Sequence, residues 1–482
     1  MAALKFYTNV SIRGNLVTIR GWNFGERINQ KIKYKPTLYL PSKDQSSKFS
    51  TIDGKAVEPV SFENIREAKN FAEKYEDVDN FKIYGSTLHQ YCCLNENYGN
   101  DYDPDKVRVV NVDIEVGSED GFPEPDRADQ PLTAITFSYR KRYYVLGINF
   151  DYKNDRDDVV YANCKNEQDL LGKFITMWRK IDPDIVTGWN VNFFDIPYLV
   201  NRIRKVLGED EAKRLSPLFD IREKKVQKFN KELVEYELVG MQILDYLELY
   251  RKFTYTQQES YRLDHIGSVE LGLKKIDYSE VETLHQLYKT DYQKFLDYNI
   301  RDVEIVDGLD DKMKLIEMVM AIAYDAKVNY GDTFTQVRMW DVLTHNYLLK
   351  NNIVVPPKTG NRKDAQFAGA YVKAPQVGMH EWVMSFDLNS LYPHLIMQYN
   401  ISPETFVDGM FADTNVDKIL DRDVDLVDNM CLTPGGHYFR KDAQGFLPEM
   451  MQTMYDERKL YKKKMLESQN ELEEVNRQLA NG

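Results

Sequence analysis

Two carboxylates, Asp113 and Glu115, stand in a stretch where apolar and polar residues alternate. The stretch, 109–116, reads VVNVDIEV. Alternation with a period of two is typical of a β-strand and places both carboxylates on one face, about 7 Å apart. Two carboxylates that point the same way repel each other unless a cation lies between them. The pair therefore predicts a divalent-cation site, and the alternative is a polar strand face exposed to solvent.

Two further carboxylates follow later in the chain. Asp195 comes after an apolar strand and a Gly-Trp-Asn turn and heads a predicted helix, so capping of that helix is an alternative explanation for it. Tyr298 and Asp302 are four residues apart in another predicted helix, which places the phenol and the carboxylate on the same face. Such pairs also occur by chance on helix surfaces.

Together, the three segments resemble the exonuclease motifs of family B DNA polymerases: D-I-E on a strand, N-x-x-F-D at a helix start and Y-x-x-x-D on a helix. The resemblance implies an RNase H-like domain that removes nucleotides from the 3′ end of single-stranded or primer-template DNA. Two Mg²⁺ ions, which Mn²⁺ can replace, suit carboxylate ligands and this hydrolysis. By the same resemblance Asp113 bridges both ions, and Tyr298 orients the attacking water. The ligand set would be completed by Glu115, Asp195 and Asp302.

A second motif lies in residues 382–396, WVMSFDLNSLYPHLI. The pattern predicts an apolar strand that ends at Asp387, followed by a turn into a helix containing Pro393. It matches the D-x-x-S-L-Y-P signature of the family B palm, called motif A, and the alternative is an Asp that caps a helix. The resemblance implies metal binding at Asp387 and Leu388, and binding of the incoming deoxynucleoside triphosphate by Ser390, Leu391 and Tyr392.

Two weaker signals flank motif A. Upstream, Phe367, Gly369 and Ala370 stand where the family has an aromatic-x-Gly-Gly/Ala segment that contacts template DNA, although the usual aromatic residue there is tyrosine. Downstream, Arg458 and Lys462 are four residues apart on one face of a predicted helix. They resemble the basic residues of the first fingers helix, which bind the triphosphate, and the alternative is a solvated helix face.

Length and pattern indicate a multidomain α/β and α+β chain, because 482 residues exceed one ordinary domain. Short strands dominate the start, strands and helices alternate in the middle, and the tail from 450 to 480 contains neither Gly nor Pro. With the resemblance, five parts are expected. They are a β-rich N-terminal domain at 1–105, the exonuclease domain at 106–315, a helical return to the N-terminal domain at 316–358, a partial palm at 359–444 and the first fingers helix at 445–482.

Composition places the chain in the soluble globular class, with 43% hydrophobic and 29% charged residues. A net charge of −13 argues against a protein that coats nucleic acid indiscriminately, but it permits an enzyme with acidic metal sites. The four cysteines have no metal-ligand spacing, and no apolar run predicts a signal peptide or a membrane span. We therefore expect a cytoplasmic protein, in the host cell if it is viral.

The tract Tyr34-Lys35-Pro36 and the stretches DGFPEP (120–125) and KRLSP (213–217) resemble polymerases of T-even-type bacteriophages within this family. The chain contains no D-T-D motif, second fingers helix or thumb of that pattern. One expectation is a polymerase split within the fingers, whose C-terminal partner chain completes the site, and the alternative is a fragment. Two rival functions are a stand-alone exonuclease with a vestigial palm and a translational regulator that binds messenger RNA through the N-terminal domain.

Overall fold

The computed structural model describes residues 4–75, 78, 81–117, 121, 123–228, 231–277, 281, 283–357, 372–424 and 426–481. The chain separates into two compact units, each discontinuous in sequence. Unit 1 comprises 1–37, 61–74 and 86–347, and unit 2 comprises 38–60, 75–85 and 348–482. The five-part division expected from the sequence stays a prediction.

Unit 1 is built on a mixed six-stranded sheet with the order β10-β9-β8-β7-β11-β14. The central strand β7 is antiparallel to β8 and parallel to β11. The strands are β7 (Val109–Val116), β8 (Leu132–Tyr139), β9 (Arg142–Ile148), β10 (Val159–Cys164), β11 (Ile185–Thr187) and β14 (Gln242–Ile243). The strand predicted at 109–116 is therefore confirmed.

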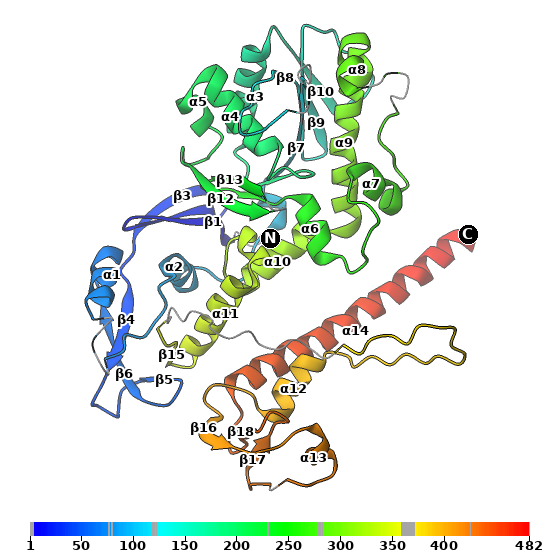
Figure 1. The fold of residues 1–482 in the computed structure, drawn as a ribbon. Helices are drawn as coiled ribbons and strands as arrows, with labels where there is room; N and C mark the ends of the chain where they lie inside the picture. The colour runs from blue at the N-terminus through cyan, green and yellow to red at the C-terminus, as the bar shows by residue number, and fades with distance from the viewer. Residues whose placement is uncertain are drawn as a thin grey trace. The chain divides into compact units, whose positions relative to one another are not determined.

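Helices cover both faces of this sheet (Figure 1). On one face, α3 (Glu167–Ile181) and α4 (Asp195–Leu207) pack on a core that includes Val112 and Ile114. On the other face, α9 (Tyr292–Met313) packs against β7, β8 and β9. Because side chains alternate along β7, its polar residues face α9. The face opposite the large apolar core is thus where the candidate carboxylates meet a helix.

The remaining elements of unit 1 surround this sheet. An antiparallel sheet of β1, β2 and β3 opens the chain, and β12 and β13 form a two-stranded hairpin. The elements are β1 (Lys5–Arg13), β2 (Leu16–Asn23), β3 (Glu26–Lys33), α1 (Ile65–Lys74), α2 (His89–Asn97), η1 (Pro104–Lys106), α5 (Glu209–Lys213), β12 (Ile221–Lys228), β13 (Lys231–Leu238), α6 (Tyr246–Phe253), α7 (Leu263–Leu271), α8 (Leu284–Thr290), α10 (Leu315–Ala326), η2 (Tyr330–Phe334) and α11 (Gln336–Lys350), which ends in unit 2.

An acidic turn joins the first sheet to the six-stranded sheet. In the turn between α3 and β11, Asp182 accepts a hydrogen bond from Arg20 at 2.7 Å, and Asp184 accepts one from Thr8 at 2.6 Å. Arg20 and Asp184 are both fully buried. A buried charge needs a partner of this kind, so these bonds fix the first sheet to the domain that carries the carboxylates.

Unit 2 contains two small sheets, of order β15-β5-β6-β4 and β16-β18-β17, and a pair of helices in contact, α12 and α14. Its elements are β4 (Thr37–Pro41), β5 (Phe49–Thr51), β6 (Ala56–Ser61), β15 (Ile353–Val354), α12 (Leu391–Tyr399), β16 (Phe406–Phe411), α13 (Val416–Leu420), β17 (Met430–Leu432), β18 (His437–Arg440) and α14 (Phe446–Asn481). The long helix predicted for the tail is confirmed as α14.

The strand predicted to end at Asp387 is wrong. Residues 372–390 contain neither strand nor helix, and Val383, Phe386 and Leu388 are 76%, 86% and 70% exposed. A strand needs a neighbour to satisfy its backbone groups, and the described residues of unit 2 pair none with this segment. The predicted helix that follows is present and begins at Leu391.

Candidate metal centre

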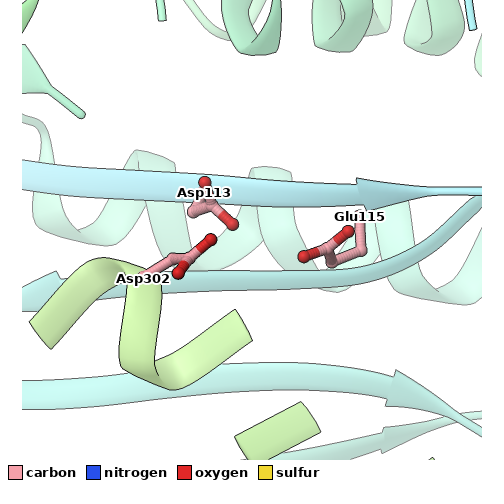
Figure 2. A group of neighbouring side chains, drawn as sticks. All are labelled: Asp113, Glu115 and Asp302. Carbon is pink, nitrogen blue, oxygen red and sulfur yellow. The ribbon is translucent and has the colours of Figure 1, made fainter. Parts of the chain in front are cut away.

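Three carboxylates converge between β7 and α9. Asp113 and Glu115 leave the same face of β7, and Asp302 comes from α9 to meet them (Figure 2). One oxygen of each lies within 4.8 Å of an oxygen of the others. Glu115 and Asp302 are buried, and Asp113 is partly exposed. Neighbouring carboxylates that are withdrawn from water need a counter-charge, so this geometry supports the cation site predicted from the strand pattern.

Burial determines the pKa values of the carboxyls in this group. Burial, followed by the charges of Asp195, Asp302 and Glu115, raises the pKa of Asp113 well above its usual value. Burial and then Asp302 raise the pKa of Glu115 to about 8. Without a cation, these carboxyls therefore hold protons near neutral pH.

Asp195 lies beside this group rather than within it. It is the first residue of α4, which has no side-chain cap, and its Oδ1 accepts the backbone N–H of Ile114 at 3.1 Å. Burial raises the pKa of Asp195 to about 7. The capping alternative is thus replaced by a bond to β7, between the two strand carboxylates.

The turn that delivers Asp195 is held by two residues with different roles. A Cβ on Gly188 would lie 2.5 Å from the carbonyl oxygen of Val112, so only glycine permits this approach to β7. The buried Asp245 accepts the backbone N–H groups of Asn190 and Asn192, each at 3.0 Å. Asp245 precedes α6, and nothing in its local sequence indicates this role.

Lys275 is a functional candidate that the sequence pattern did not reveal. It follows α7 in a segment without regular structure, where adjacent lysines look like solvated charges. Its Nζ donates a hydrogen bond to Asp302 and another, of 3.0 Å, to the phenol of Tyr298. Burial alone would lower the pKa of Lys275, but Asp302, Tyr298 and Asp113 outweigh it, so the pKa is raised. The site therefore contains a permanent cation of its own.

Tyr298 stands on the same turn of α9 as Asp302. It is 6% exposed, and burial, followed by the charge of Asp302, raises its pKa, so the phenol is protonated at neutral pH. A protonated phenol can donate a hydrogen bond, which is the property that orientation of a water molecule requires.

The donor set fits a hard divalent cation. Carboxylate oxygens are the ligands that Mg²⁺ and Mn²⁺ prefer. Asp302 Oδ1 is buried and has no hydrogen-bond partner among the described residues, although Oδ2 is paired with Lys275. A buried carboxylate oxygen without a donor, next to two other carboxylates, is suited to a metal ion.

A separate cavity of about 1080 Å³ lies beside the β12–β13 hairpin and α6. Its lining includes Asn190, Asn192 and Arg251, but none of the carboxylates of the metal group. The candidate site is therefore defined by the convergence of side chains and not by this cavity.

The predicted motif A residues lie in unit 2 and are mostly exposed. Asp387, Leu388 and Tyr392 are exposed, and Ser390 adopts a left-handed conformation, with φ at 54°, immediately before α12. The Arg458 guanidinium lies 3.4 Å from Ser390 Oγ. The structure thus brings the basic face of α14, which also carries Lys462, next to the start of α12. The predicted template contacts Phe367, Gly369 and Ala370 lie outside the described residues.

Comparisons with known proteins agree with this architecture. Residues 62–266 match the model of the DNA polymerase family B exonuclease domain, and residues 312–481 match the model of DNA polymerase family B. The chain is 34% identical to a DNA-directed DNA polymerase of Escherichia phage RB69 and 31% identical to that of Enterobacteria phage T4. Each of these alignments covers 99% of this chain and 56% of the relative. A DNA polymerase of Pyrococcus glycovorans is 26% identical over 77% of this chain and 44% of its own length.

The chain therefore belongs to DNA polymerase family B. It spans 56% of the length of each phage relative. Asp113 and Asp195 fall within the range matched by the exonuclease model, whereas Tyr298 and Asp302 lie between the two matched ranges. Among the described residues, no helix is long and apolar enough to cross a membrane.

Proposed function

We propose that unit 1 is a 3′→5′ exonuclease that hydrolyses single-stranded DNA with Mg²⁺ or Mn²⁺. The observation that carries the proposal is the convergence of Asp113, Glu115 and Asp302 within 4.8 Å. A family match to the exonuclease domain supports the same reaction class. These three carboxylates and Asp195 would hold the cations. When bound, such cations supply a hydroxide nucleophile at neutral pH and stabilise the leaving 3′ oxygen.

The protein's own residues prepare this site in three ways. Ile114 fixes Asp195 through its backbone N–H, so one carboxylate is oriented before any ligand arrives. Lys275 neutralises part of the negative charge and fixes both Asp302 and the phenol of Tyr298. The Tyr298 phenol, protonated at neutral pH, orients the attacking water. Preorganised groups of this kind lower the cost of assembling the transition state.

The polarity of cleavage tests the proposal. A 5′-labelled oligonucleotide incubated with Mn²⁺ should give a ladder that shortens stepwise from the 3′ end, and EDTA should abolish the ladder. A circular single strand of the same sequence is the matched control, because it has no end and should resist cleavage. Cleavage of the circle would show an endonuclease and contradict the proposal.

A second proposal concerns nucleotide binding in unit 2, and the 3.4 Å approach of Arg458 to Ser390 favours it. In this proposal Asp387 and Leu388 hold metal ions, and the triphosphate is bound by Ser390, Leu391, Tyr392, Arg458 and Lys462. Binding of a fluorescent deoxynucleoside triphosphate with Mg²⁺ should weaken in Arg458→Ala. Equal affinity in the wild type and the variant would remove Arg458 from the site.

DNA polymerisation is proposed only for a larger assembly. Motif A supplies one metal-binding aspartate, and the 482 residues contain no D-T-D motif to supply the others. We propose that a C-terminal polymerase chain provides that motif and a thumb, and that the complex acts on primer-template DNA in a host-cell cytoplasm. Primer extension should appear only when such a chain is added. Binding of messenger RNA by the N-terminal residues stays a prediction.

A further inference from the structure

Asn299 is a fully buried amide in the helix that carries the metal group. It lies next to Tyr298 and three residues before Asp302, and its exposure is 0%. Its neighbours along α9, Leu296, Ile300 and Val303, are buried apolar residues. A polar amide in such surroundings loses its hydration, so its presence calls for a specific partner.

The partner of Asn299 is Asp113. The Nδ2 group of Asn299 donates a hydrogen bond of 2.6 Å to Asp113 Oδ2. When a cation is bound, Asp113 is ionised and only accepts hydrogen bonds, so the amide must then present its N–H₂ group to it. The amide oxygen, Oδ1, is then left buried without a partner among the described residues. The arrangement satisfies Asp113 and leaves the other end of the amide unsatisfied.

A second asparagine provides a comparison within the same interface. Asn111 lies two residues before Asp113 on β7 and is also buried. Its Nδ2 donates to the carbonyl oxygen of Val303 at 2.9 Å and to Asp307 at 2.8 Å, and its Oδ1 likewise has no partner in the described part of the chain. Both asparagines tie β7 to α9. Only the bond from Asn299 ends on a member of the carboxylate group.

We infer that Asn299 is a positioning residue of the metal centre, whose amide holds the Asp113 carboxylate in the orientation that accepts a divalent cation. This inference rests on the proposed exonuclease function. A bond from a side chain without rotational freedom fixes one oxygen of Asp113 before a cation arrives. Removal of a residue that orients a metal ligand commonly lowers the metal affinity or the activity by about 10–100-fold.

The test measures cation binding directly. Asn299→Leu keeps the branched shape of the side chain, lacks the donor and also removes the unpaired amide oxygen. The affinity for Mn²⁺ should be about 10–100-fold weaker in this variant. The electron paramagnetic resonance signal of free Mn²⁺ measures this affinity. Hydrolysis of single-stranded DNA should fall at limiting Mn²⁺, whereas thermal stability in EDTA should fall no further than in the control variant that follows.

Asn111→Leu is the matched control. It removes the same kind of buried donor from the same interface but leaves the Asn299–Asp113 bond in place. Its thermal stability should fall because Asp307 loses a partner, while its Mn²⁺ affinity should stay within about twofold of the wild type. Equal loss of Mn²⁺ affinity in both variants would mean that Asn299 acts only by packing α9 on β7, and would overturn the inference.

A second pair of variants applies if Asn299→Leu does not fold. Asn299→Gln and Asn299→Met have side chains of similar length, and only the glutamine amide can donate to Asp113. The Gln variant should bind Mn²⁺ more tightly, and equal affinities would overturn the inference. Failure of the wild type to hydrolyse DNA would instead remove the proposed function. Wild-type activity with unchanged Mn²⁺ affinity in Asn299→Leu would remove only the role of Asn299.

Discussion

Asp113 in unit 1 and Asp387 in unit 2 both stand in segments that resemble acidic motifs of family B polymerases, but their surroundings differ. Asp113 lies on a central strand, next to two other carboxylates and in a hydrogen bond with Asn299. Asp387 lies in an exposed segment without strand or helix. The comparison teaches that a motif identifies the residues of a site, whereas a sheet and a covering helix are required to preorganise them.

Amide hydrogen exchange should show the largest contrast between the two regions. Amides in β7 and α9 form regular hydrogen bonds around a buried core, so their exchange requires a large opening of the structure. Residues 372–390 lack such bonds within regular elements. We expect exchange in β7 and α9 to be at least about 10³-fold slower than in 372–390, measured by mass spectrometry. Similar protection in both regions would contradict the comparison.

Replacing Tyr298 by Phe tests whether the preorganised site uses its phenol for chemistry. Hydrolysis of single-stranded DNA at saturating Mn²⁺ should fall by about 10²–10⁴-fold, the usual contribution of a group that orients or transfers a proton. Mn²⁺ affinity should change little, because the phenol is not assigned as a ligand. Normal turnover with weakened Mn²⁺ binding would assign Tyr298 to the metal instead.

Lys275→Met tests the internal cation of the site. Loss of the ammonium leaves Asp302 without its partner, and the rate of hydrolysis should fall by about 10²-fold, as for removal of one preorganised donor. Lys274→Met is the matched control, because it changes the net charge equally at an adjacent exposed residue. The two variants should differ clearly in single-turnover assays. Equal rates would show that Lys275 has no role in the site.

The raised pKa values of the buried carboxyls predict that the stability of the metal-free protein in EDTA depends on pH. This effect is smaller than the changes in hydrolysis rate expected above. The pKa of Glu115 is raised to about 8 and that of Asp195 to about 7, chiefly by burial. A carboxyl whose pKa is raised in the folded state stabilises the fold below its unfolded pKa, and this stabilisation is lost as pH rises through the folded pKa. The free energy of unfolding should therefore decrease from about pH 4.5, just above the unfolded pKa values, to about pH 8, where the folded pKa of Glu115 lies.

Glu115→Gln stays neutral and should flatten this decrease by up to about 1.4 kcal/mol per pH unit. Urea denaturation at several pH values in EDTA measures both proteins. Parallel pH profiles for the wild type and the variant would contradict the raised pKa of Glu115.

The regular elements of the site could be predicted from the sequence because their periodicity is strong. The alternation in 109–116 predicted β7, and the four-residue spacing of Tyr298 and Asp302 correctly placed both on a helix. The strand before Asp387 was wrong because apolar composition alone cannot supply a neighbouring strand.

Lys275, Asp245 and Asn299 could not be found in the same way. Lys275 follows α7 without a periodic pattern, and Asp245 acts on a turn more than fifty residues earlier in the sequence. Asn299 looks like one more polar residue in a helix that also carries many charged side chains. Each acquires its role only through the tertiary contact with a distant segment, and local patterns do not encode such contacts.

The most direct test of the central claim is a comparison of Asp113→Ala and Asp387→Ala in the hydrolysis of 5′-labelled single-stranded DNA with Mn²⁺. Asp113→Ala removes the central carboxylate of the metal group and should reduce the initial rate by at least about 10²-fold. Asp387→Ala changes a motif in the other unit and should leave the rate within about twofold of the wild type. Undiminished hydrolysis by Asp113→Ala, or an equal loss in both variants, would contradict an exonuclease site built in unit 1.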